Sequence, residues 1–373
     1  MKFIDLSSQQ KKIRPNLDKR FKNIMNHGKY IMGPEVFELE EKLADYVGVK
    51  HCISCSSGTD ALLIPLLASG IGIGDAIITT PFTYIATAEV IALLGATPIF
   101  CDIYPKTYNL DPSLLDKAYN EALSKGLKPK AIIPVDLFGL PARYRLINQY
   151  AKDKDLFVLE DAAQGFGGSI NAKKAGSFGD VAATSFFPAK PLGCYGDGGA
   201  IFTNDDQLAM KMQSIRVHGS GQDKYDNVRI GINGRLDTFQ AAVVLEKLKI
   251  FDDEIHSRNE IAEVYSRKLT KKVIKPHIPI NYISSWAQYS ILCDNKSMRD
   301  MIIKSLSNNK IPSMIYYRIP LHLQKVFKYL KYNINDFPIS EDISNNIFSL
   351  PMHPYLNKID QNRIIETLNS IIK

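Results

Sequence analysis

Seven short apolar runs between residues 50 and 205 constrain the fold of this 373-residue chain more than any other feature. Most of them are separated by stretches long enough to form a crossover helix, which is the pattern of a mainly parallel sheet with helices on both faces. The link from Pro188 to Gly199 is too short for a crossover and is rich in glycine, so we expect an antiparallel return there. The sequence therefore predicts an α/β fold with a mixed, mainly parallel sheet, whose strands lie at His51–Cys55, Ala76–Thr80, Thr97–Ile103, Ala131–Val135, Phe157–Glu160, Val181–Phe187 and Ala200–Thr203.

Helical patterns flank this core on both sides. Apolar residues recur at helical spacing from Val36 to Val47, and Leu236–Ile250 reads as a long helix. The charged segment Phe251–Glu260 is interpreted as a hinge, because a chain of this length usually forms two lobes. We therefore predict a large domain over residues 1–250, with an N-terminal helical segment, and a smaller α+β domain over residues 251–373. The smaller domain is expected to contain a terminal helix and strands at Ala287–Cys293 and Pro312–Tyr317.

The overall composition excludes several classes of protein. Apolar residues make up 45% and charged residues 23% of the chain, as in soluble globular proteins. The net charge is +7 and the charged residues are scattered, so nucleic-acid binding is not indicated, and a mildly basic cleft for an anionic substrate fits the same charge. The N-terminus lacks the apolar core of a signal peptide, and the most apolar stretch, Ala61–Ile73, is too short to span a membrane. Together with an odd number of cysteines, these features predict a cytoplasmic protein with reduced thiols and no membrane partner.

Cys52 and Cys55 have the spacing of a metal or redox site. Both lie in a predicted strand, where residues three apart face opposite sides, so their sulfur atoms are expected to diverge. No second cysteine pair or histidine pair with zinc-site spacing follows. We therefore expect no bound metal.

Functional residues follow three of the predicted strands, at the edge where open α/β sheets bind ligands. Ser57, Gly58 and Thr59 open a helix whose hydroxyls and free N–H groups can hold an anion, although an ordinary capped helix start has the same pattern. Asp161 ends a strand where a carboxylate can hold a protonated ring nitrogen of a cofactor, and the alternative is a helix N-cap. Tyr84 follows another strand and can either stack on a flat ring or belong to the core.

The segment around Lys190 is the most informative. A strand ends in a short loop bounded by Pro188 and Pro191, and Lys190 lies between them among apolar neighbours. Burial lowers the pKa of a lysine and leaves an amine that can form a Schiff base. The alternative is an ordinary surface lysine, but the glycine-rich continuation is typical of close packing around a ligand.

Taken together, these segments resemble the DegT/DnrJ/StrS-type sugar aminotransferases, which depend on pyridoxal 5'-phosphate (PLP). The resemblance spans nearly the whole chain and rests on the motifs SSGTDAL, PFTYIAT, EDAAQ, SFFPAKPLGCYGDGG and GINGRLD, in this order. It implies PLP fold type I, the fold of aspartate aminotransferase, and a homodimer with shared active sites. It also implies that Lys190 is the Schiff-base lysine and that Asp161 pairs with the pyridine nitrogen. The further cofactor contacts that it implies are Ser57, Gly58, Thr59, Tyr84, Gln164, Ser185 and, across the subunit interface, Asn233.

Within this family, the chain looks most like the UDP-2-acetamido-2-deoxy-3-oxo-glucuronate aminotransferases, which use glutamate to install a 3-amino group. This likeness rests on the run from Phe187 to Tyr195 and on the close from Leu350 to Leu356. It implies a nucleotide-linked keto-sugar as substrate and a role in lipopolysaccharide or O-antigen biosynthesis. The sugar contacts are expected at Arg235, Tyr316, Tyr317 and His322.

Three alternatives remain open at this point. Where the sub-group has His-Tyr-Pro, this chain has Tyr316-Tyr317-Arg318, so the substrate can instead be a 4-keto-6-deoxy nucleotide sugar. A related branch of PLP-dependent sugar dehydratases has histidine in place of the lysine. A catalytically silent regulator with the same fold is the third alternative. The presence of Lys190 disfavours the dehydratase, and the intact Lys190, Asp161 and Tyr84 disfavour the silent regulator.

Overall fold

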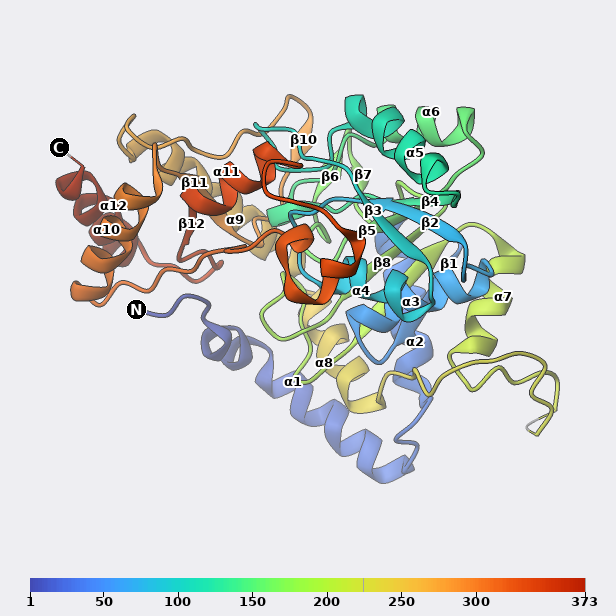
Figure 1. Ribbon diagram of the computed structural model, residues 1–373. Helices are drawn as coiled ribbons and strands as arrows, with labels where there is room; N and C mark the ends of the chain where they lie inside the picture. The colour runs from blue at the N-terminus through green and yellow to red at the C-terminus, as the bar shows by residue number, and fades with distance from the viewer. Residues whose placement is uncertain (224, 373) are drawn as a thin grey trace.

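A seven-stranded sheet forms the centre of the computed structural model, which describes residues 1–223 and 225–372 (Figure 1). The strand order is β1-β9-β8-β5-β4-β2-β3. All neighbouring pairs from β8 to β3 are parallel, whereas β9 runs antiparallel to both β8 and β1. The predicted mixed sheet and its antiparallel return are therefore confirmed. The strands are β1 (His51–Cys55), β2 (Asp75–Thr79), β3 (Thr97–Phe100), β4 (Lys128–Ile133), β5 (Phe157–Asp161), β8 (Val181–Ser185) and β9 (Gly199–Thr203).

Helices cover both faces of this sheet. Alternate residues of each strand point to opposite faces and pack into the hydrophobic core on that face. Cys52 packs with the helices of one face and Cys55 with those of the other, so the two sulfurs diverge as predicted. One face is covered by α3 (Gly58–Ala68), α4 (Ala86–Leu93) and α7 (Asp206–Ile215). The other is covered by α1 (Leu6–His27), α2 (Pro34–Val47), α5 (Leu115–Ser124), α6 (Tyr144–Asp153) and α8 (Thr238–Leu248).

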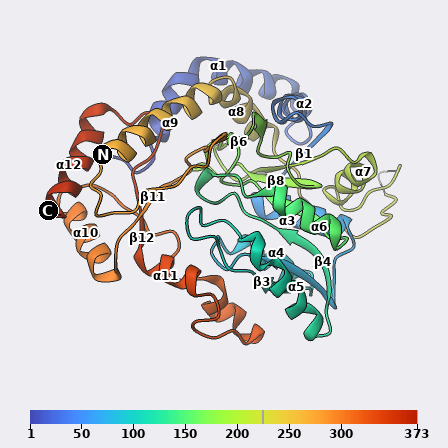
Figure 2. The same cartoon turned by 90° about the horizontal axis from the view of Figure 1, so that it is seen from above.

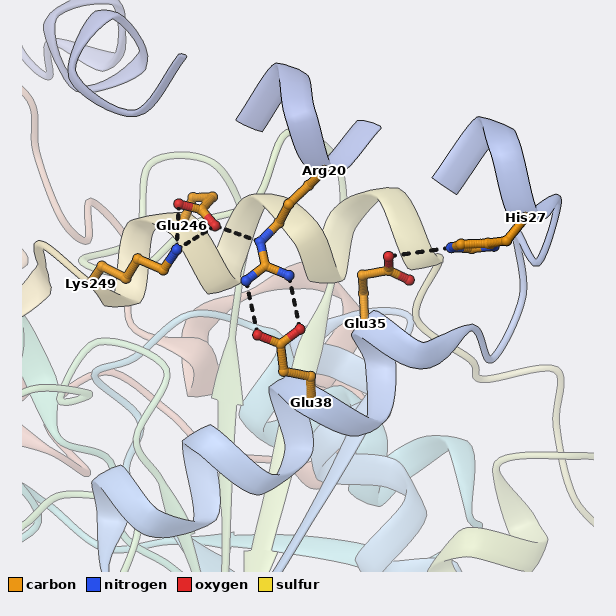
Figure 3. Close-up of polar contacts among 6 residues, drawn as sticks. All are labelled: Arg20, His27, Glu35, Glu38, Glu246 and Lys249. Carbon is orange, nitrogen blue, oxygen red and sulfur yellow. Dashed lines mark hydrogen bonds and ion pairs between the residues drawn. The ribbon is translucent and has the colours of Figure 1, made fainter. Parts of the chain in front are cut away.

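Ion pairs fasten the N-terminal helix α1 to α2 and α8 (Figure 3). Arg20 on α1 donates two hydrogen bonds of 2.8 Å to the carboxylate of Glu38 on α2. Arg20 Nε also donates to Glu246 on α8, whose carboxylate accepts from Lys249 as well. Bidentate arginine–carboxylate geometry fixes orientation as well as distance, so α1 is held in one position against its two neighbours.

The helix α9 (Phe251–Lys268) occupies the segment that we interpreted as a hinge, so that interpretation is corrected. Phe251 and Ile255 pack in the core below the large sheet, whereas Ile261 and Tyr265 pack in a separate C-terminal core. Most of its charged residues lie at exposed positions of an amphipathic helix that connects the two cores, whereas Glu254 and Arg258 are buried. The exposed charges explain why the segment resembled a polar linker. The boundary near residue 250 stays a prediction.

The C-terminal part contains a two-stranded sheet of β11 (Tyr289–Leu292) and β12 (Ile347–Leu350). The strand predicted over Pro312–Tyr317 is wrong, since only Met314 forms an isolated bridge, to Ser349. Pro312 has no N–H to donate to a ladder, and β12 takes the place beside β11. The described part of the chain also forms the helices α10 (Lys296–Asn308), α11 (Pro338–Asn346) and α12 (Lys358–Ile371), four short 3-10 helices, and a small sheet of β10 (Tyr282–Ile283), β6 (Ser169–Ile170) and β7 (Lys173–Lys174).

The chain folds back on itself, so that the N-terminus lies beside the C-terminal part of the molecule (Figure 2). The segment from Ile315 to Ile347 returns to the large sheet and packs against Phe82, Val135 and Phe138. Parts of the chain that are far apart in sequence therefore meet at the carboxyl ends of β2, β4 and β5. Over the described residues, no helix is both long and apolar enough to cross a membrane.

Candidate active site

Asp161 is the last residue of β5 and is buried, with 5% of its surface exposed. Its carboxylate accepts hydrogen bonds from Thr87 Oγ1 at 2.8 Å and from the N–H of Ala163 at 3.2 Å. Burial raises the pKa of Asp161, while the Thr87 hydroxyl, the Lys190 charge and the Ala163 N–H each lower it. The next element after β5 is β6, so Asp161 caps no helix.

Lys190 lies in the loop that follows β8, the strand next to β5 in the sheet. Its backbone N–H donates to the carbonyl of Phe187 at 2.9 Å, which closes a turn from Phe187 to Lys190. The side chain is partly buried, and burial lowers the pKa of Lys190, with the Asp161 carboxylate opposing that shift. A lysine with a lowered pKa therefore shares a region of low polarity with a buried carboxylate. Neighbouring parallel strands bring the two together, because their carboxyl ends share one edge of the sheet.

The start of α3 and the end of β8 form a tight pair beside this loop. Ser57 Oγ accepts from the N–H of Asp60 at 3.0 Å and caps α3. A Cβ atom on Gly58 would lie 2.5 Å from the Cβ of Ser185, so only glycine allows this approach. The hydroxyl of Ser185 and the first N–H groups of α3, at Gly58 and Thr59, thus converge. The capped-helix reading and the anion-binding reading describe the same structure, because a helix N-terminus attracts negative charge.

Gln164 and Tyr317 form the side of the site nearest the C-terminal segment. Gln164 is buried, its Oε1 accepts from the N–H of Phe138 at 2.8 Å, and its Nε2 donates to the Tyr317 hydroxyl at 3.1 Å. The Tyr317 ring packs edge-on against Phe82, with ring centroids 6.1 Å apart. Tyr84 is 57% exposed, so it is not a core aromatic and its ring is free to stack on a flat ligand.

The residues expected to contact the sugar differ in how close they lie to the rest of the site. Tyr316 lies next to Tyr317, whereas His322 is buried, with Nε2 3.1 Å from Glu341 and its ring against Phe337. Burial lowers the pKa of His322, with the Glu341 carboxylate opposing that shift. His322 is thus engaged within the C-terminal segment, and it stays the weakest of the predicted contacts.

Asn233 and Arg235 lie together in the loop before α8. Arg235 donates to Asn233 Oδ1 at 3.1 and 2.7 Å, and Asn233 is exposed. The alternative that Asn233 caps its own helix is not what the structure shows, because Asp237 occupies the cap position of α8. The side-chain amide of Asn233 therefore remains accessible from outside the chain.

Thr87 is the site residue that the sequence did not reveal. Its hydroxyl lies 3.2 Å from that of Thr83 and donates to Asp161. The signal was present in the motif PFTYIAT, where the two threonines are four apart and hence on one side of a helical turn. Nothing in that motif indicated that this turn faces the end of β5.

These residues bring together kinds of group that can bind PLP. They provide an amine with a lowered pKa, a buried carboxylate for a ring nitrogen, an exposed aromatic ring and an anion-binding helix start at the edge of a mainly parallel sheet. The fold and the site thus define a PLP-dependent enzyme of fold type I.

Comparison with known proteins identifies the family. The model of the DegT/DnrJ/EryC1/StrS aminotransferase family matches residues 11–369, and the chain belongs to that family. It is 48% identical over 358 residues to the UDP-2-acetamido-2-deoxy-3-oxo-D-glucuronate aminotransferase of Pseudomonas aeruginosa, which covers 96% of each chain.

Solved structures agree with this assignment. An aminotransferase of the same family from Brucella abortus is 50% identical, with a TM-score of 0.96 and 99% of both chains covered. NtdA from Bacillus subtilis, solved with the bound cofactor PMP, is 28% identical with a TM-score of 0.90, covering 99% of this chain and 83% of that one. The predicted fold type I is therefore confirmed.

Proposed function

We propose that this protein transfers an amino group from glutamate to a nucleotide-linked keto-sugar, the 3-oxo form of UDP-N-acetylglucosaminuronate. The observation that supports the reaction class is the placement of Lys190 and the buried Asp161 at the carboxyl ends of the neighbouring strands β8 and β5, where each charge influences the pKa of the other. The likeness to the Pseudomonas aeruginosa enzyme supports the particular sugar. We also keep the predicted cytoplasmic location and the role in surface-polysaccharide biosynthesis as parts of this proposal.

The residues of the site divide the binding of PLP among them. Ser57, Gly58, Thr59 and Ser185 would hold the phosphate, because their hydroxyl and N–H groups converge at the start of α3. Asp161 would hold the ring nitrogen, Tyr84 would stack on the ring, and Gln164 would lie near the ring hydroxyl. When bound, PLP supplies an electron sink that stabilises negative charge on the substrate carbon.

Lys190 would carry two tasks in sequence. Its amine would bind the cofactor covalently, which requires the neutral form that burial favours. Once displaced by the amino donor, the same amine would move a proton between cofactor and substrate carbons as a general acid and base. Asp161 would keep its negative charge throughout, aided by the Thr87 hydrogen bond.

The sugar would bind between the cofactor and the C-terminal segment. Tyr316 and Tyr317 lie there, and a basic residue, Arg235 or Arg318, would pair with the carboxylate of a uronate in a bidentate manner. We propose His322 as a further contact. A homodimer would complete the site, with Asn233 of each subunit reaching the cofactor phosphate of the other.

A substrate comparison tests this function. The purified protein would be converted with glutamate to the amino form of its cofactor and then mixed with UDP-linked 3-oxo uronate or with dTDP-linked 4-keto-6-deoxy sugars. We expect faster return of the original absorbance with the uronate and a product mass that shows an added amino group. Faster reaction of the 4-keto sugars would overturn the sugar assignment only, whereas a deoxy-sugar product would show a dehydratase.

A further inference from the structure

The N-terminal segment, residues 1–5, reaches the loop that carries two of the proposed sugar contacts. The ring of Phe3 packs against that of Tyr316, with centroids 6.4 Å apart and planes at 53°. Tyr316 in turn packs against Tyr317, with centroids 5.8 Å apart and planes at 67°. Phe3 is only partly exposed, although it belongs to no helix or strand. The start of the chain thus contributes to a wall of the proposed sugar site.

Polar contacts hold this segment in place. Asp5 accepts hydrogen bonds from Ser7 Oγ at 2.8 Å, Ser8 Oγ at 2.7 Å and Lys2 Nζ at 2.9 Å. The backbone of Lys2 lies near the buried His353, where it opposes the lowering of the histidine pKa by burial. The segment is therefore anchored on both sides of Phe3, and the aromatic contact with Tyr316 does not rely on a free chain end.

Tyr316 is suited to contact a ligand. It is partly buried, and burial raises the pKa of its phenol. None of the described residues is hydrogen-bonded to its hydroxyl, so that group is available. The hydroxyl of the neighbouring Tyr317, in contrast, already accepts a hydrogen bond from Gln164. The Tyr317 hydroxyl is therefore bound on the cofactor side of the site, whereas the Tyr316 hydroxyl is available to the sugar.

We propose that Phe3 is a positioning residue for the sugar acceptor, because its ring holds the Tyr316 hydroxyl where it contacts the nucleotide-linked sugar. This inference rests on the proposed function and adds to it a specificity-determining residue from the N-terminal segment. The contacts with Phe3 and Tyr317 are the aromatic packing that restrains the Tyr316 ring. Loss of the Phe3 ring removes one of the two aromatic contacts of Tyr316, while the hydrogen bond from Gln164 to Tyr317 stays in place.

The two half-reactions separate this role from a structural one. We expect Phe3→Ala to raise the KM for the UDP-linked 3-oxo uronate by up to about tenfold, the fold-change that matches loss of an aromatic pair. The half-reaction with glutamate should keep its rate. Phe3→Tyr keeps the ring and should restore the KM. Leu123→Ala, which removes an exposed apolar side chain on α5, is the matched control and should change neither half-reaction.

A double-mutant cycle and a titration complete the test. In a Tyr316→Phe background the hydroxyl is gone, so Phe3→Ala should have little further effect on the sugar KM. Independently of turnover, NMR titration of labelled Tyr316 should show its pKa falling toward the ordinary value of about 10 in Phe3→Ala, because the ring becomes exposed.

The inference would be overturned by an unchanged sugar KM, by equal losses in both half-reactions, or by an unchanged Tyr316 pKa. A wild-type protein that aminates no nucleotide-linked keto-sugar would contradict the proposed function instead. In that case the Tyr316 titration still decides whether Phe3 positions this tyrosine.

Discussion

Thr87 Oγ1 donates a 2.8 Å hydrogen bond to the buried carboxylate of Asp161, from the first turn of α4 to the end of β5. Burial makes this carboxylate harder to ionise, and the hydroxyl opposes that effect. A carboxylate that pairs with a protonated ring nitrogen must be charged. Thr87 therefore supports the charge on which the proposed chemistry depends, and two predictions follow from this contact.

Asp161→Asn should bind PLP but lose about a hundredfold or more of the turnover rate, comparable to removal of a key electrostatic group. An amide cannot stabilise a protonated ring nitrogen, so the electron sink weakens. Steady-state rates with cofactor occupancy measured by absorbance would check this. Near-normal turnover would reduce Asp161 to a structural residue.

Thr87→Val should shift the acidic limb of the pH–rate profile to higher pH. The charged form of Asp161 is active, so activity is lost as pH falls through its pKa, and removal of the hydroxyl raises that pKa further. We expect a rate loss of about tenfold at neutral pH, as for a hydrogen bond to a charged group. Thr87→Ser keeps the donor and serves as the control. An unmoved acidic limb would contradict this role.

Mixed dimers test whether Asn233 acts across the interface. One chain would carry Lys190→Ala and the other Asn233→Ala, provided that each variant is inactive as a homodimer. If Asn233 serves the partner subunit, one site collects both defects and the other is intact, so activity returns. A dead mixture of demonstrably exchanged subunits would show that Asn233 acts within its own chain.

Lys247 on α8 gives a prediction about stability. Its side chain is buried, its Nζ has no hydrogen-bond partner among the described residues, and burial lowers its pKa to about 8. The unfolded chain binds this proton up to a pH of about 10.4, so stability should rise with pH between about 8 and 10.4. Lys247→Met should remove that rise and increase the free energy of unfolding at pH 7 by on the order of 2 kcal/mol. Denaturant unfolding of the wild-type protein and of Lys247→Met, at pH 7 and at a pH of about 10, measures both effects. An equal pH dependence in both proteins would contradict the prediction.

The main sheet was predictable from the sequence because buried strands are nearly continuous apolar runs. The approach of Lys190 and Asp161 also followed from their positions, since both come after strands whose carboxyl ends share an edge. The helix α1 was harder to see. Only Gln9, Ile13, Leu17 and Ile24 of its 22 residues are buried, and the ion pairs of Arg20 with α2 and α8 stabilise it.

The C-terminal segment could not be read from local pattern alone. Pairing of β12 with β11 joins residues more than fifty positions apart, and Pro312–Tyr317 has the composition of a strand without its partners. The contact of Thr87 with Asp161 and that of Phe3 with Tyr316 likewise depend on how distant segments pack. Spacing within a motif carries no information about such contacts.

Borohydride reduction of the PLP-loaded protein, followed by peptide mapping, tests the central claim most directly. Reduction fixes the bond between cofactor and lysine, so the labelled residue identifies the amine that performs the chemistry. The lowered pKa of Lys190 and its place beside Asp161 predict the label on Lys190, and Lys190→Ala should abolish both the label and turnover. A label on any other lysine, with Lys190 unmodified, would contradict the account.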